Sequence, residues 1–137
     1  MKDSIHADWA GGMAFEAHVD GFKIMTDAKA EVGGSNKGPR PKPLMMVALA
    51  GCTGMDVISI LKKMRVEVKS FIVRVEGDLT EEHPKHFQKM HIIYEFEGDN
   101  LPMDKLEKAI NLSQERYCGV STSYRMAMEL SHEIRIK

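Results

Sequence analysis

The chain contains two cysteines, Cys52 and Cys118, and each lies in a setting that favours thiol chemistry. Cys52 follows a glycine- and proline-rich loop with several basic residues, and Gly51 and Gly54 flank it on an apolar helical segment. Cys118 ends one expected helix and begins another, where free backbone N–H groups stabilise a thiolate. Two thiols in such settings suggest a dithiol redox couple. The alternative stays open that each is a small core residue, because free cysteine is among the most buried residue types.

Other residue types give weaker signals for chemistry. His83, His86 and His91 follow one another in or near a polar turn without matching carboxylates, which favours a solvated loop over a metal site. We therefore predict no metal site. The 11 methionines are typical of core filler, although methionine-rich pockets also accept apolar ligands. The sequence contains no nucleotide-binding, serine-hydrolase or zinc-protease motif, and we expect no cofactor.

The elements that must position the cysteines follow from the hydrophobic pattern. Near the N-terminus the residues alternate as in short strands, and Asp20-Gly21 predicts a hairpin turn between two of them. A long loop rich in glycine and proline follows, up to Pro43, and loops of this kind are often functional. A helix is expected next, over about residues 44–64, with Pro43 in its first turn. The first half of this helix is apolar on all sides, which predicts that it is buried all round.

Further strands and helices complete the chain. The spacing of apolar residues predicts strands over about 66–75 and 89–96, helices over about 102–117 and 122–128, and a last strand over about 130–136. The predicted order is β-β-β-α-β-β-α-α-β, an α+β fold with helices packed on antiparallel sheet. We expect a single domain over residues 1–137.

Composition excludes several classes of protein. The 137 residues are 43% hydrophobic and 28% charged, as in an ordinary globular domain. A net charge of −1 gives no electrostatic reason to expect nucleic acid or a membrane as partner. The longest stretch without a charged side chain, Pro43 to Met55, is shorter than the roughly 20 apolar residues of a membrane span. No export signal is visible, so we expect a cytoplasmic protein without a structural disulfide.

Two segments carry a resemblance that extends over nearly the whole chain. The first is Gly38-Pro39-Arg40-Pro41-Lys42-Pro43-Leu44 with the following Ala48-Leu49-Ala50-Gly51-Cys52, and the second is Tyr117-Cys118-Gly119-Val120-Ser121. They resemble the OsmC/Ohr family of osmotically inducible and organic hydroperoxide resistance proteins, whose signature is Leu-Ala-x-Cys followed by Cys-Pro-Val-Ser. The Gly-Gly-x-Asn-x-Gly-Pro-x-Pro loop and Asp56 are most similar to the YhfA-like branch of this family.

The resemblance implies an OsmC-like fold, in which antiparallel sheets pack on a long central helix and two subunits form an intertwined homodimer. It also implies that Cys52 is the peroxidatic cysteine, whose thiolate attacks an organic hydroperoxide and becomes a sulfenic acid. Cys118 would then be the resolving cysteine, which forms a disulfide with Cys52. A small thiol or a lipoyl-type dithiol would reduce this disulfide.

This chain departs from the peroxidase members of the family at several positions. Where those members carry a glutamate upstream of the first cysteine, the chain has Lys42 and Pro43, and it has no arginine before Arg40. Arg40 is therefore the candidate substrate-binding residue. Gly119 takes the place of the usual proline. Two alternatives to catalysis stay open: a protein that binds a small apolar or electrophilic ligand at the dimer cleft, and a thiol redox sensor.

Overall fold

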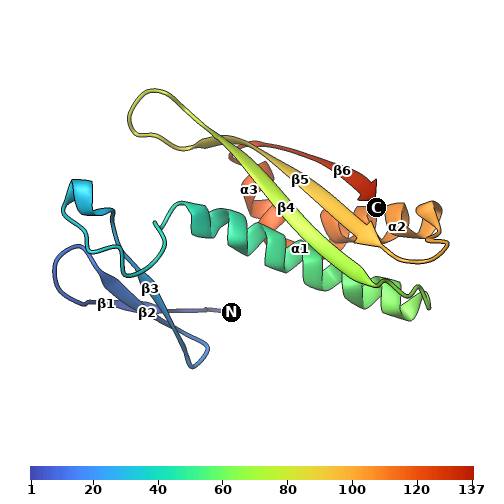
Figure 1. Ribbon diagram of the computed structural model, residues 1–137, viewed down its shortest axis with the longest axis horizontal. Coiled ribbons are helices and arrows are strands. Elements are labelled where there is room, and N and C mark those ends of the chain that lie inside the picture. Colours follow the sequence, from blue (N-terminus) through green and yellow to red (C-terminus); the bar gives the residue numbers. More distant parts are fainter. The chain divides into compact units, whose positions relative to one another are not determined.

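The order of helices and strands agrees with the order predicted from the sequence. The computed structural model describes residues 1–137, and contacts within the chain divide it into two compact units, Met1–Met45 and Met46–Lys137. The elements are β1 (His6–Trp9), β2 (Phe15–Val19), β3 (Phe22–Thr26), α1 (Pro43–Lys63), β4 (Ser70–Leu79), β5 (Phe87–Glu97), α2 (Met103–Leu112), α3 (Gly119–Arg125) and β6 (Glu129–Ile136) (Figure 1). A 3-10 turn spans Ala30–Val32, and a π-helical turn spans Ser113–Tyr117. The predicted α+β fold class is confirmed.

The first unit is a three-stranded antiparallel sheet in the order β1-β2-β3. The predicted hairpin is confirmed, since Asp20 and Gly21 both have positive φ angles (52° and 83°), as the tight turn between right-twisted strands requires. Only two side chains of this unit, those of Ala14 and Asp27, are buried. The sheet therefore has almost no hydrophobic core of its own.

Asp27 organises the glycine-rich loop that follows β3. Its carboxylate accepts hydrogen bonds from the backbone N–H groups of Ala28, Ser35 and Lys37, at 2.7–3.1 Å. These bonds, that from Lys37 above all, hold the pKa of Asp27 below its usual value. The backbone also folds back closely on itself, because a Cβ atom on Gly34 would lie 1.9 Å from the Ala28 carbonyl oxygen. The loop therefore needs both a carboxylate at Asp27 and a glycine at Gly34.

Helix α1 buries one face and exposes another. The buried face consists of Leu49, Thr53, Val57 and Leu61. On another face Val47 is 62% exposed and Met55 73% exposed, and Ile58 is exposed as well. The prediction that the first half of this helix is buried all round is therefore wrong for the single chain, because the sheet and the other helices cover only one side of it.

By length and composition alone, α1 would be sufficient to cross a membrane, even though its uncharged part is short. The core helix of a globular domain passes the same test. In this chain 22% of the apolar window is buried, and the buried residues recur along one face of the helix.

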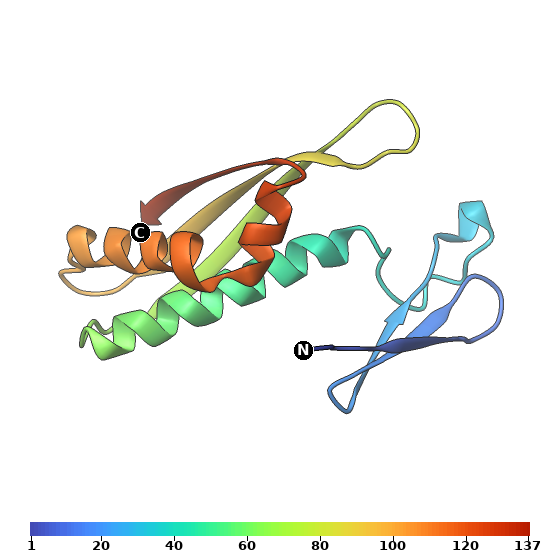
Figure 2. The ribbon, with the colours of Figure 1, turned by 180° about the vertical axis from the view of Figure 1, so that it is seen from behind.

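The second unit is a sheet in the order β4-β5-β6 with α1, α2 and α3 on one face (Figures 1 and 2). Strands β4 and β5 pair antiparallel, as predicted, but β5 and β6 pair parallel, with Tyr94 opposite Ile134. The expectation of purely antiparallel sheets is wrong at this one pairing. Parallel neighbours need a crossover connection, and α2, the π-helical turn and α3 supply it.

The central strand β5 forms the middle of the core. As the alternation predicts, Met90, Ile92, Tyr94 and Phe96 share one face, and all four are fully buried. Glu95, on the other face, is nearly buried as well, because Lys137 and Arg74 cover it with ion pairs of 2.7 and 3.1 Å. These two partners, Lys137 first, hold the pKa of Glu95 below its ordinary value. The carboxylate thus stays charged on a largely apolar strand.

The connection from α2 to α3 differs from the single long helix predicted over 102–117. The α-helix ends at Leu112, and the backbone widens into the π-helical turn Ser113–Tyr117. The wider turn leaves both Ser113 and Gln114 buried, and π-helical turns are frequent at functional sites. Helix α3 begins at Gly119, three residues earlier than predicted.

A candidate dithiol site

Cys52 and Cys118 come together in the second unit. Their sulfur atoms and a carboxylate oxygen of Asp56 all lie within 4.8 Å of one another. Both cysteines are free thiols. A disulfide needs sulfurs about 2.05 Å apart, so the two thiols must move toward each other to form one. The sequence suggested such a pair, and the structure brings its members together.

The start of α3 fixes the position of Cys118. Its sulfur caps this helix by accepting a hydrogen bond from the backbone N–H of Ser121, at 3.3 Å. Its own N–H donates to the carbonyl oxygen of Ser113 and so closes the π-helical turn, at 2.8 Å. Gly119 follows as the first residue of α3, and nothing lies within 4 Å of a Cβ atom at this position. Since proline is well suited to the first position of a helix, the change from proline to Gly119 leaves the cap intact.

The two sulfurs differ in their access to solvent. Cys52 is partly exposed, whereas Cys118 is 1% exposed. Burial raises the pKa of the Cys118 thiol, and the neighbouring Cys52 adds to the rise, although Ser121 offsets part of it. The sequence-based expectation of a stabilised thiolate at Cys118 is therefore wrong in its net direction, because desolvation outweighs the helix cap. Cys118 rests as a neutral thiol.

We predict that Cys52 reacts with iodoacetamide at least about tenfold faster than Cys118 at pH 8, since alkylation requires an accessible thiolate. Labelling of Cys118 should rise only at higher pH, because its pKa is raised. Peptide mass spectrometry over a time course measures both rates, and the protein unfolded in urea provides the control in which the two rates converge. Equal rates in the folded protein would contradict this account.

Beside the thiols, Asp56 is the end point of a chain of buried hydrogen bonds. Ser113 Oγ donates to Asp56 Oδ2 at 2.9 Å, and Ser113 Oγ lies 2.8 Å from Thr53 Oγ1. Thr53 Oγ1 lies 2.7 Å from the Tyr94 hydroxyl, to which Gln114 Nε2 donates at 2.7 Å. Each hydroxyl has one proton to donate. Each hydrogen bond must therefore be donated in the same direction: Gln114 donates to Tyr94, Tyr94 to Thr53, Thr53 to Ser113, and Ser113 to Asp56.

The far end of this chain is held by a cation. Arg125 Nη2, on α3, donates to both the backbone oxygen and the side-chain oxygen of Gln114, at 3.2 Å each. Burial raises the pKa of the Tyr94 hydroxyl in the middle of the chain, and the negative charge of Asp56 contributes to the rise. The hydroxyls thus remain protonated donors, and the last of them, that of Ser113, donates to the Asp56 carboxylate.

A pocket of about 320 Å³ borders Asp56. Its lining consists of Asp56, Ser59, Ile60, Lys63, Leu112 and Tyr117. The aliphatic and aromatic walls suit an apolar group, and the two charged side chains can bind a polar end. The pocket and the thiol pair share Asp56, and neither cysteine lines the pocket.

Sequence reasoning identified the cysteines and noted Asp56 only as part of the resemblance, and it missed the buried residues behind them. Asp56 lies one helical turn after Cys52, and this i, i+4 spacing places both on the same side of α1. This spacing is visible in the sequence alone. Ser113 and Gln114 carried no local signal, because their inward orientation depends on the π-helical turn.

The remaining residues that the sequence suggested make contacts of their own. Arg40, in the first unit, donates through Nη2 to Asn36 Oδ1 and to the Gly38 carbonyl oxygen, and its role as a substrate-binding residue stays a prediction. The three histidines that were considered as metal ligands do not converge. His83 and His86 are exposed in the turn, as predicted, and His91, on β5, bonds Ser131 and Glu133.

Comparison with known proteins places the chain in a family. The sequence model of the OsmC-like proteins matches residues 34–133. Protein YhfA of Escherichia coli strain K12 is 28% identical over 129 residues, which cover 93% of each chain. The chain therefore belongs to the OsmC-like protein family, and the resemblance seen in the sequence is confirmed.

Solved structures agree with this assignment. A hypothetical protein from Aquifex aeolicus superposes with a TM-score of 0.84 at 29% identity, covering 100% of this chain and 98% of the other. An organic hydroperoxide resistance protein OsmC from Legionella pneumophila, described as a predicted redox protein, superposes with a TM-score of 0.67 at 18% identity, covering 97% of each chain. The latter likeness concerns the fold alone.

Proposed function

We propose that this protein is a thiol-dependent redox protein that reduces organic hydroperoxides through Cys52 and Cys118. The observation that carries the proposal is the convergence of both sulfurs and the Asp56 carboxylate within 4.8 Å. The name of the Legionella protein, an organic hydroperoxide resistance protein, supports the substrate class. The predicted compartment, the cytoplasm, would supply the reducing thiols that such a cycle needs.

The proposed reaction proceeds in two steps in which atoms and electrons balance. The Cys52 thiolate attacks the distal oxygen of the hydroperoxide, the O–O bond breaks, and the alkoxide leaves as an alcohol after taking up a proton. Cys52 is then a sulfenic acid. The Cys118 sulfur attacks this sulfenic acid, a disulfide forms, and the hydroxyl leaves as water. A dithiol reductant supplies two electrons and two protons to restore both thiols.

Asp56 is placed to assist the second step. Cys118 must lose a proton to attack, and burial holds its pKa high. A carboxylate oxygen of Asp56 lies within 4.8 Å of both sulfurs and can accept this proton directly or through one water. The hydrogen bond donated by Ser113 orients the Asp56 carboxylate for that role.

The pocket beside Asp56 favours an alkyl or aryl hydroperoxide over hydrogen peroxide. Ile60, Leu112 and Tyr117 provide apolar walls that gain free energy from an organic group and nothing from hydrogen peroxide. The test is steady-state consumption of cumene hydroperoxide and of hydrogen peroxide, with dihydrolipoate as the reductant. We expect faster consumption of cumene hydroperoxide, and no consumption above the rate of free dihydrolipoate would refute the proposal.

One observation favours the redox sensor as a second candidate function. Burial raises the pKa of the Cys118 thiol, which disfavours the thiolate that must attack in every catalytic cycle. A sensor needs only one oxidation, whereas a peroxidase must form its thiolate in every cycle. The two functions differ in turnover: a sensor forms the disulfide once and is reduced slowly, and a peroxidase cycles as long as dihydrolipoate is present.

We further propose that the chain forms a homodimer through the exposed apolar face of α1. Val47, Met55 and Ile58 recur at helical spacing on that face. Gly51 lies in the same row, and nothing within this chain lies within 4 Å of a Cβ atom there. A second subunit can approach closely at such a position, and its apolar residues would cover the row.

Met55→Lys should convert this homodimer into a monomer, because it places a charge within the apolar face. Sedimentation velocity at micromolar concentration measures the change in mass. Met103→Lys, which places the same charge on an exposed residue of α2, is the matched control and should stay dimeric. A monomeric native protein, or a dimeric Met55→Lys variant, would contradict the proposed interface.

A further inference from the structure

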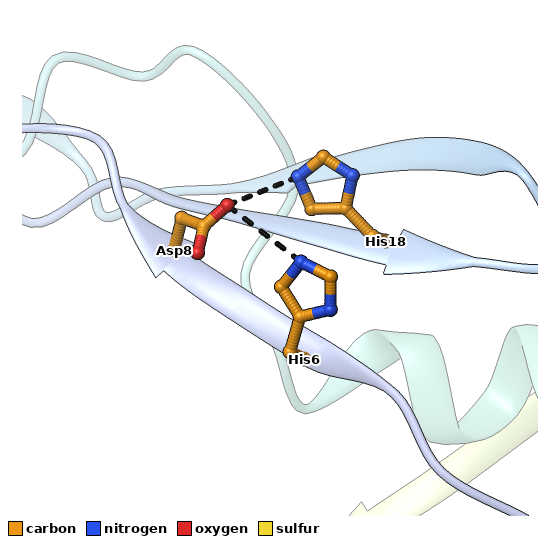
Figure 3. Close-up of side chains that lie close together, drawn as sticks. All are labelled: His6, Asp8 and His18. Carbon is orange, nitrogen blue, oxygen red and sulfur yellow. Dashed lines mark ion pairs between the residues drawn. The ribbon is translucent and has the colours of Figure 1, made fainter.

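Four side chains with metal-binding atoms project from one face of the hairpin formed by β1 and β2. His6 lies opposite His18 in the strand register, and Asp8 lies opposite Glu16. Because side chains alternate along a strand, the i, i+2 pairs point to the same side of the sheet. Figure 3 shows both imidazole rings directed toward the carboxylate of Asp8.

The ligand atoms of three of these residues already lie close together. Asp8 Oδ2 lies 3.1 Å from Nε2 of His18 and 3.8 Å from Nε2 of His6. One ligand atom from each of the three residues lies within 4.8 Å of the others. Ligands at 2.0–2.2 Å from a tetrahedral ion are roughly 3.3–3.6 Å apart. One of the two observed distances is therefore slightly shorter, and the other slightly longer, than the distance between ligand atoms in an occupied site.

A second observation concerns the charge around His18. Its Nε2 atom lies between two carboxylates, 3.1 Å from Asp8 Oδ2 and 3.2 Å from Glu16 Oε1. Neither contact has the direction of a hydrogen bond, and this nitrogen is shielded from solvent. Two anionic oxygens thus converge on a nitrogen that has no hydrogen-bond partner. A cation bound at this point would satisfy all three atoms.

We propose that His6, Asp8 and His18 bind a divalent transition-metal ion, zinc by the chemistry of the donors, with the adjacent Glu16 carboxylate as a fourth donor. Two imidazoles with one or two carboxylates form a donor set that zinc accepts in tetrahedral geometry. The rings of His6 and His18 are stacked 4.6 Å apart at 11°. A modest turn about each Cβ–Cγ bond, which has a broad torsional preference, directs both nitrogens toward a shared ion.

The position of the site suggests that the ion braces the first sheet. Within the single chain the unit Met1–Met45 buries only Ala14 and Asp27, so its own hydrophobic burial contributes little to its stability. Small units of this kind are commonly stabilised by a metal ion. An ion held by β1 and β2 together would join the first strand to the second, and any ligand that binds only the folded state stabilises it.

The test uses zinc on a Cys52→Ser/Cys118→Ser chain, because the two thiols and Asp56 form a second group of possible metal ligands. Isothermal titration calorimetry should show one zinc ion per chain. His6→Ala and His18→Ala should each weaken the affinity at least about tenfold, as expected for loss of a direct ligand. His86→Ala, which changes an exposed histidine outside the cluster, is the matched control and should bind as the parent does.

Two-dimensional NMR of the histidine side chains covers the case in which a variant does not fold. In the cysteine-free parent, zinc should shift the Nε2 resonances of His6 and His18 and leave those of His83 and His86 unchanged. The absence of zinc binding at 100-fold excess, or unchanged affinity in both His→Ala variants, would overturn the proposal. The dithiol activity is not involved in this test, so a failure of the zinc proposal leaves the proposed redox function untouched, and the reverse also holds.

Discussion

Cys52→Ser is expected to lower the consumption of cumene hydroperoxide to the rate of free dihydrolipoate, a loss of at least about a thousandfold relative to the native protein. The reason is chemical, because a serine hydroxyl cannot form the sulfenic acid on which the cycle depends. The partly exposed Cys52 is the sulfur that a substrate can reach, whereas the buried Cys118 is not. The assay is steady-state consumption with reductant in excess.

Cys118→Ser should behave differently from Cys52→Ser. The first step stays intact, so one equivalent of hydroperoxide is consumed rapidly and the mass of the protein rises by about 16 Da, the mass of one oxygen atom. Further turnover should then slow sharply, because dihydrolipoate must reduce the sulfenic acid without the resolving thiol. Leu79→Ser, at an exposed position of β4, is the control for a general effect of substitution. Equal activity in both cysteine variants would contradict the assigned roles.

Thr53→Val is expected to lower the free energy of unfolding by about 1–3 kcal/mol, because it leaves buried polar partners unsatisfied. Thr53 is fully buried, and its hydroxyl links Tyr94 to Ser113. Valine has nearly the same shape, so packing is conserved while the hydrogen bonds are lost. Urea denaturation measures the change. Thr26→Val, outside this chain of hydrogen bonds, is the control and should change stability by less than about 0.5 kcal/mol.

A double-mutant cycle with Tyr94→Phe tests whether the hydrogen bonds act as one chain. If they do, Thr53→Val/Tyr94→Phe should cost less than the sum of the two single changes, because each single change already leaves the other partner unsatisfied. Strict additivity would show that the two hydroxyls are independent. The same variants should slow disulfide formation if Ser113 and Asp56 are positioned through Thr53.

Much of the fold could be predicted from local sequence patterns. The hairpin at Asp20-Gly21 follows from the positive φ angles that the turn demands, and the central strand follows from its alternation. The parallel pairing of β5 and β6 could not be predicted, because strand neighbours are set by the crossover and not by local propensity. The exposed face of α1 could not be predicted for a related reason, because an apolar sequence does not show which other elements cover it.

The candidate site was predictable only in part. The settings of Cys52 and Cys118 pointed to thiol chemistry, but their spacing along the chain could not show that the sulfurs meet within 4.8 Å. The helix cap at Cys118 was foreseen, yet burial reverses its effect on the pKa, and burial depends on tertiary packing. His6, Asp8 and His18 were missed because their approach depends on strand register, which places residues from two strands on one face.

The most direct test of the account is the intact mass of the reduced protein after addition of one equivalent of cumene hydroperoxide. The proximity of Cys52 and Cys118 predicts a loss of about 2 Da within seconds, the mass of the two hydrogens removed when a disulfide forms. Both Cys→Ser variants should lack this loss. An unchanged mass over many minutes in the native protein would contradict the assignment of the pair as a redox couple.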